Sequence, residues 1–186
     1  MSRVTSLLSA CLRLFREDTR SFIYSFLTTP FTQVELKPYN PQIQIHASRI
    51  ARQIRSLSPG VSVHFFGSSA LKIAGRGDID LVVTCSPRSL SRLSSVFIAE
   101  FGPPQHQADR LLKWVFMRRT FPVELVLTDN KSAEFLAQRR IFNILKNNPG
   151  ILKQYAAIKN NLDHLTHWEY ELRRKDFFNQ VLKHAL

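Results

Sequence analysis

Residues 61–83 read VSVHFFGSSALKIAGRGDIDLVV, and this stretch decides the fold of the chain around it. An apolar, β-prone run stops at Gly67-Ser68, and a second such run begins at Ile79. We therefore expect a strand, a turn of small residues and a second strand that carries Asp78 and Asp80. Successive side chains of a strand point to opposite faces, so the two aspartates should point the same way.

Two carboxylates on one face repel each other unless a cation lies between them or one of them keeps its proton. Mg²⁺ meets this need, because it prefers a few carboxylates together with phosphate oxygens and waters. A third acid, Glu124, stands in an otherwise apolar strand, where carboxylates are rare unless paired or bound to a cation. Taken singly, each acid is explained by a turn cap or an ion pair with an arginine. Their combination with the Gly67-Ser68 turn favours a site.

The chain has 186 residues and an ordinary hydrophobic content of 44%, which fits one soluble domain with a real core. Its formal net charge of +12 predicts attraction to polyanions such as RNA or nucleotide phosphates, although a generically basic surface would look the same. The two cysteines, Cys11 and Cys85, are too few for a disulfide framework, and the histidines lack zinc-ligand spacing.

The first 31 residues form a basic extension in which apolar residues recur at helical spacing from about residue 3 to 28, before Pro30. We expect a helix docked on the core or on a partner subunit, and a homo-oligomer formed through it is one such arrangement. The first sixteen residues also resemble an organelle-targeting presequence. No run is long and apolar enough to span a membrane. A cytoplasmic protein is therefore expected, with an organelle as the alternative.

The remaining chain, 32–186, reads as one domain of mixed α/β character up to about residue 130 and of helices from residue 131. We predict an α/β (α+β) fold with a mixed sheet. Periodicity and breakers give an extended segment at 31–41, helices at 43–57 and from Ser86-Pro87 to about 101, strands at 61–66, 79–83, 111–117 and 123–127, and helices at about 132–147, 151–164 and 167–185.

The residues between the two central strands each suit a task in nucleotidyl transfer. Gly67 lets a phosphate approach the backbone, and Ser68 offers it an N–H and a hydroxyl. Asp78 and Asp80 would hold Mg²⁺, and Glu124 would complete a second metal position or accept a proton from the attacking hydroxyl. Two basic residues of the intervening loop, Lys72 and Arg76, would offset phosphate charge.

Gly-Ser, a gap of about ten residues and Asp-x-Asp on a strand resemble the signature of the DNA polymerase β-like nucleotidyltransferase superfamily. Within it, the chain looks like the GrpB family, from about residue 33 to the C-terminus. The likeness is carried by Val34-Glu-Leu-Lys-Pro-Tyr-Asn-Pro41, Gly67-Ser68-Ser69, Asp78-Ile79-Asp80, Asn147-Asn-Pro149, Tyr155-Ala-Ala-Ile-Lys159, Tyr170, Lys175 and Phe177.

The resemblance implies a mixed sheet with a metal-dependent site on its face, Mg²⁺ or Mn²⁺ as cofactor, and an NTP as substrate. It assigns phosphate or metal roles to Gly67, Ser68, Ser69, Asp78 and Asp80, and it implies that Lys159 and Lys175 reach the triphosphate. Two departures stand out. Ala70 to Gly75 replaces the commoner Pro-Gly loop, and Phe142 stands where many members carry an arginine, for which Arg139 or Arg140 is the substitute.

These observations leave an enzyme as the first hypothesis, namely a Mg²⁺-dependent nucleotidyltransferase that moves an NMP from an NTP to a hydroxyl acceptor. A catalytically inactive nucleotide- or nucleic-acid-binding module of the same fold is the alternative, because basic residues are frequent on the predicted helices.

Overall fold

A computed structural model describes residues 32–108 and 110–184, so the predicted helix at 3–28 lies outside the described residues. The described chain forms two compact units. The first consists of residues 36–135, and the second combines residues 32–35 with 136–184. The predicted division into an extension of 31 residues and one following domain stays a prediction.

The first unit is built on a mixed five-stranded sheet, as expected from the sequence. Its order is β1-β2-β5-β4-β3, in which only the central β2–β5 pair is parallel. The bounds are Ser62–Phe66 for β1, Ile79–Cys85 for β2, His106–Ala108 for β3, Leu111–Arg118 for β4 and Phe121–Asp129 for β5.

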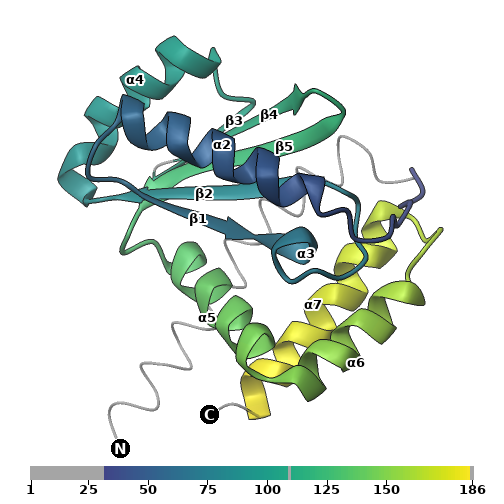
Figure 1. The fold of residues 1–186 in the computed structure, drawn as a ribbon. Helices are drawn as coiled ribbons and strands as arrows, with labels where there is room; N and C mark the ends of the chain where they lie inside the picture. Colours follow the sequence, from purple (N-terminus) through teal and green to yellow (C-terminus); the bar gives the residue numbers. More distant parts are fainter. Residues whose placement is uncertain (1–31, 109, 185–186) are drawn as a thin grey trace, which may run out of the picture. The chain divides into compact units, whose positions relative to one another are not determined.

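Two helices, α2 (Gln42–Leu57) and α4 (Leu90–Phe101), cover one face of this sheet (Figure 1). Each buries one stripe of apolar side chains, because apolar residues recur every three or four positions. They pack on alternate residues of the two central strands, namely Ile79, Leu81 and Val83 of β2 and Val123, Leu125 and Leu127 of β5. The shared core contains Ile43, Ala47, Ile50, Ile54, Ile79, Leu81, Val83, Leu93, Phe97, Leu112, Trp114, Val123, Leu125 and Leu127.

Several local predictions were wrong in detail. The turn after β1 is a single helical turn, α3 (Gly67–Ala70), and β2 begins at Ile79, so Asp78 precedes the strand instead of lying in it. The helix predicted from Ser86-Pro87 begins as a 3-10 turn, η1 (Pro87–Ser89), before α4. The short strand β3 was not predicted. Its three residues are too few for a periodicity to be recognised.

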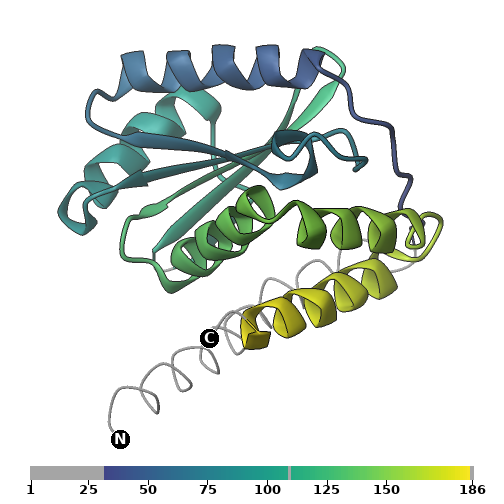
Figure 2. The ribbon, with the colours of Figure 1, turned by 60° about the horizontal axis from the view of Figure 1, so that its bottom comes forward.

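The second unit is helical. It holds most of α5 (Ala133–Asn147), then α6 (Pro149–Asn160) and α7 (His167–His184), and the last two lie side by side (Figure 2). Asn148-Pro149 was predicted only as a stop, but Pro149 is also the first residue of α6, where its missing N–H costs nothing. A capping box begins α7, because Thr166 and Glu169 bond each other's backbone N–H.

The extended segment 32–35 belongs to this helical unit. Gln33 forms a β-bridge with Thr166, and the Val34 N–H donates to the Leu165 carbonyl at 2.8 Å. Lys37 forms a second bridge, with Gly75, so the extended conformation predicted at 31–41 is confirmed at these two bridges, whereas Pro41 already has helical backbone angles as the N-cap of α2. None of the helices in the described ranges is long and apolar enough to cross a membrane.

Cys85 lies at the end of β2 and is 6% exposed. Burial raises the pKa of its thiol, and the negative charge of Asp129 adds to the effect. The neutral thiol is therefore the stable form, and Cys85 behaves as a small core residue.

We expect the Trp114 side chain to dominate core stability. It is 1% exposed, packs on Phe97 and Phe101, and donates its indole N–H to the Gly102 carbonyl at 2.8 Å. Trp114→Ala should lower the free energy of unfolding by about 3–5 kcal/mol in urea denaturation. Trp114→Phe should cost less, because a phenyl ring keeps most of the packing and loses only the hydrogen bond. Equal losses in the two variants would contradict this assignment.

Candidate active site

The face of the sheet opposite α2 and α4 carries the predicted carboxylates. Asp80 of β2 is the register partner of Glu124 on β5 and of Phe66 on β1. Since register partners on neighbouring strands point to the same face, Asp80 and Glu124 stand side by side. Phe135, at the start of α5, packs on Phe66 on this same face, with ring centroids 6.4 Å apart.

Asp78 lies in the loop just before β2, two residues ahead of Asp80, and it is 9% exposed. Its carboxylate forms an ion pair with Arg76, with 2.7 Å between Arg76 Nη2 and Asp78 Oδ2. The buried hydroxyl of Ser69 donates to the Asp78 carbonyl at 2.9 Å. Ser69 therefore ties α3 to the loop that carries Asp78, which is a structural task not foreseen from the sequence.

Gly67 is a glycine because the Asp80 carboxylate occupies the space where a side chain would begin. A Cβ built on Gly67 would lie 1.8 Å from Asp80 Oδ2, and the residue has φ +75°. Both facts exclude a larger residue without movement of Asp80. In the structure this glycine makes room for the Asp80 carboxylate, and its predicted role beside a phosphate stays a prediction. Ser68, next to it, is partly exposed.

Glu124 is neutralised by a residue that the sequence analysis did not single out. Lys113 of β4 lies diagonally across from it on the same face, with 2.9 Å between Lys113 Nζ and Glu124 Oε1. Both side chains are about one-third exposed, at 30% for Lys113 and 34% for Glu124. The signal was present in the sequence, because Lys113 alternates with the buried Leu112 and Trp114 and so must face the other way.

The site's fit to a divalent cation is partial. The donors are hard carboxylate oxygens, which suit Mg²⁺, and one or two of them suffice when phosphates and waters complete the shell. Asp78 and Asp80 meet that requirement from adjoining positions. In the described parts of the chain, however, no three side chains of His, Cys, Asp or Glu come close enough together to hold a metal ion. Glu124 is turned to Lys113 instead.

The basic residues predicted to bind phosphate belong to both units. Lys72 is exposed in the loop after α3 and has φ +59°, while Arg76 is engaged by Asp78. Lys159 and Lys175 belong to the helical unit, so their predicted role at a triphosphate stays a prediction.

Within the helical unit, Lys159 is 2% exposed, and its ammonium lies over the rings of Tyr155 and Tyr170 at 5.6 and 5.7 Å. Such cation–π contacts stabilise a buried cation. Burial raises the pKa of the Tyr155 hydroxyl, so its ring remains neutral beside the lysine.

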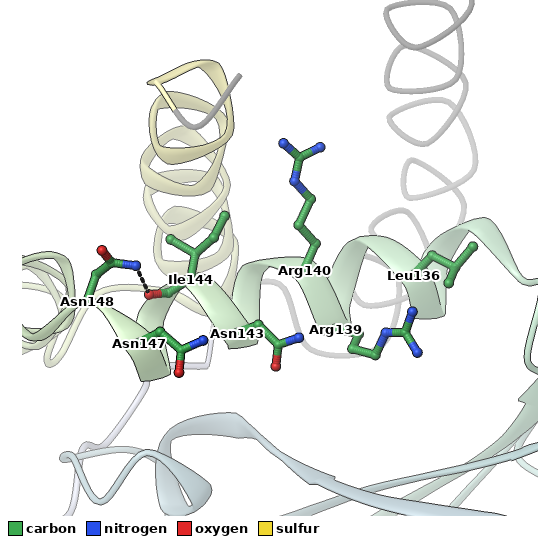
Figure 3. A pocket seen from close by; sticks show the side chains of 7 residues that line it. All are labelled: Leu136, Arg139, Arg140, Asn143, Ile144, Asn147 and Asn148. Carbon is green, nitrogen blue, oxygen red and sulfur yellow. Dashed lines mark hydrogen bonds between the residues drawn. The ribbon is translucent and has the colours of Figure 1, made fainter.

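A shallow pocket of about 360 Å³ lies along α5 in the helical unit (Figure 3). It includes Arg139 and Arg140, the two arginines that the sequence offered as substitutes at Phe142. Figure 3 shows Arg140 projecting from one side of α5 while Asn143 and Asn147 project from the other. Its lining in the described residues is Leu136, Arg139, Arg140, Asn143, Ile144, Asn147 and Asn148.

A family model described as GrpB protein matches residues 33–184. The chain belongs to the GrpB family. No curated protein matches it. Among solved structures it is similar to Cid1, which has RNA terminal uridylyl transferase activity, with 16% identity and a TM-score of 0.40 over 76% of this chain. The match spans only 47% of that Cid1 chain, and at this level the likeness carries no argument about function.

The close approach of Gly67 to Asp80 generates a stability prediction. Gly67→Ala should lower the free energy of unfolding by about 2–4 kcal/mol, because it adds a clash with a carboxylate to the strain of a left-handed backbone. Gly60→Ala is the matched control, since Gly60 has φ +92° and nothing within 4 Å of its added Cβ. The control should cost only about 1–2 kcal/mol. Equal costs in urea denaturation would show that the contact with Asp80 contributes nothing.

Proposed function

We propose that this GrpB protein is a nucleotidyltransferase that moves an NMP group from an NTP to a hydroxyl acceptor with the help of Mg²⁺. The observation that carries the proposal is the register of Asp80 with Glu124, with the Asp80 carboxylate lying against Gly67. Carboxylates brought together on one face are the donor set that Mg²⁺ and an NTP require. Family membership fits the proposal but does not by itself assign an activity.

In the proposed reaction, the oxygen of the acceptor hydroxyl forms a bond to the α-phosphorus of the NTP. The bond from that phosphorus to the oxygen bridging the β-phosphate breaks, and pyrophosphate leaves. Asp78 and Asp80 would hold the ion, which neutralises phosphate charge when bound. One carboxylate oxygen of Glu124 would take the proton of the acceptor hydroxyl, and the other would complete a second metal position. Gly67 and Ser68 would border the phosphates, with Lys72 and Arg76 offsetting their charge.

A second candidate function is a catalytically inactive module that binds nucleotide or nucleic acid. It is favoured by one observation, namely that Arg76 and Lys113 form ion pairs with Asp78 and Glu124. Side-chain cations in these places give the carboxylates the partners that a divalent cation would otherwise supply.

The proposal predicts Mg²⁺-dependent NTP binding that requires Asp80. With an NTP at about one hundred times its Kd, wild-type protein should gain about 2.7 kcal/mol and melt about 5–10 °C higher, as measured by thermal shift with and without Mg²⁺. Asp80→Asn should abolish the shift, because the amide keeps the size of the side chain and removes its charge. The matched control is Glu100→Gln on α4, over the opposite face of the sheet.

Absence of a shift with all four NTPs would overturn the proposal, and so would an unchanged shift in Asp80→Asn. Where a nucleotide binds, transfer itself is measured with NTP labelled at the α-phosphate and a panel of RNA, protein and small hydroxyl acceptors. Binding without any transfer would select the inactive module.

Lys113 provides a second test. Lys113→Met removes the ammonium group that competes with a metal ion for the Glu124 carboxylate. In a thermal-shift titration with NTP present, the concentration of Mg²⁺ or Mn²⁺ that gives half of the full shift should therefore fall severalfold. The fold should persist, because an ion pair between side chains that are each about one-third exposed contributes at most about 1 kcal/mol. The double variant Lys113→Met/Glu124→Gln should cancel the gain. An unchanged metal requirement in Lys113→Met would argue against Glu124 as a metal ligand.

A further inference from the structure

The outward side of α2 is a row of arginines. The helix buries its apolar stripe in the core, and it exposes Arg49, Arg52 and Arg55 at intervals of three residues. No aspartate or glutamate occurs between residues 42 and 57. At a rise of about 1.5 Å per residue, the three positions extend over about 9 Å of helix.

The hairpin between β4 and β5 adds two more arginines to this row. Its turn consists of Arg119 and Thr120, since Arg118 pairs with Phe121. The Phe121 ring lies 5.2 Å from that of His46 on α2, and both views place the hairpin end beside the N-terminal half of that helix (Figures 1 and 2). Arg118 and Arg119 are both exposed.

These five residues (Arg49, Arg52, Arg55, Arg118 and Arg119) form what we term the arginine cluster. Within residues 32–108 and 110–184, none of the five forms an ion pair. The contrast with the carboxylate face is sharp, because there Arg76 and Lys113 each hold an acid. Like charges gathered without counter-charges repel one another, so this arrangement costs stability unless an anion covers it.

The positive charge of the arginine cluster affects the imidazole of His46. Its pKa is lowered, first by burial and then by the positive charges of Arg119, Arg49 and Arg118. Arg49 of the helix and Arg118 and Arg119 of the hairpin therefore all lie near enough to His46 to affect its ring. No acid of the described residues is among the charges that shift this pKa.

We infer that the arginine cluster binds the phosphate backbone of a single-stranded polynucleotide. Guanidinium groups form paired hydrogen bonds to phosphate, which a row of lysines would not. The cluster is extended, so it suits successive phosphates along a strand better than one phosphate group. An anionic membrane fits less well, because a helix that binds at a membrane surface needs an apolar face toward the lipid, and α2 has buried its own in the core.

This surface is separate from the candidate active site. The arginines of α2 point away from the sheet on the side opposite Asp80 and Glu124. Polynucleotide binding therefore does not rest on the proposed transfer reaction, and it should survive Asp80→Asn.

The test uses the full chain and fluorescently labelled 20-nucleotide oligouridylate, with affinity measured by anisotropy over a series of salt concentrations. In the triple variant Arg49→Gln/Arg118→Gln/Arg119→Gln, the slope of log K against log salt should fall by about 2, since each phosphate contact contributes about 0.7 on single strands. Affinity at moderate salt should fall at least tenfold. Because the three arginines are exposed and form no ion pair with the described residues, the triple variant should melt within about 2 °C of wild type.

The matched control removes the same charge from exposed residues outside the cluster, as Arg88→Gln/Arg92→Gln/Lys131→Gln. It should change the affinity less than threefold. An equal loss in this control would overturn the inference, and so would RNA binding that is insensitive to salt. Oligothymidylate of the same length distinguishes DNA from RNA as the source of the phosphates. Binding to vesicles containing phosphatidylserine, with none to either oligonucleotide, would replace the inference by a membrane surface.

The pKa of His46 is a local measure of binding at the cluster, which the overall charge of the protein cannot mimic. Neutralising the nearby arginines should raise its pKa, so the NMR titration of the ring should move to higher pH when oligouridylate is bound. The same titration in Asp80→Asn should behave as wild type. An unmoved titration of His46 in a saturated complex would place the polynucleotide elsewhere and overturn the inference.

Discussion

The site depends on one electrostatic constraint, which is that Asp80 and Glu124 are register partners in the parallel β2–β5 pair. Neighbouring strands lie about 4.8 Å apart, so two carboxylates in these positions repel each other unless positive charge is supplied. Lys113 supplies it to Glu124 on one side. On the other side, the Asp80 carboxylate fills the space over Gly67, which explains the choice of residue there.

The sheet also separates two kinds of positive charge. On the carboxylate face, Arg76 and Lys113 are held by acids at 2.7 and 2.9 Å, and they balance local charge. On the side of α2, the arginine cluster has no such partners in the part of the chain that the structure describes. In the described residues of the first unit, the basic side chains of the two faces therefore differ in whether an acid already balances them.

The sequence predicted the features that depend on the periodicity of a single helix or strand. It did not predict the contacts that depend on how two or more elements pack together. Alternation placed Asp80 and Glu124 correctly in strands, and the resemblance to the GrpB family was confirmed. The hairpin turn was predicted at residues 118–122, but it is only two residues long. That length sets the register, and without it the pairing of Lys113 with Glu124 could not be derived. The burial of Lys159 between two rings depends on tertiary packing, which no local pattern encodes.

The backbone of Arg119 has a consequence for how the hairpin is built. Its φ is +55°, in the left-handed region where a residue with a side chain costs about 1–2 kcal/mol and where two-residue hairpin turns normally carry glycine or asparagine. A glycine at this position would relieve that strain, but it would also remove a positive charge from the hairpin turn. The hairpin thus keeps a strained backbone at Arg119 together with its guanidinium group. Backbone strain that persists at an exposed position is typical of residues retained for binding rather than for stability.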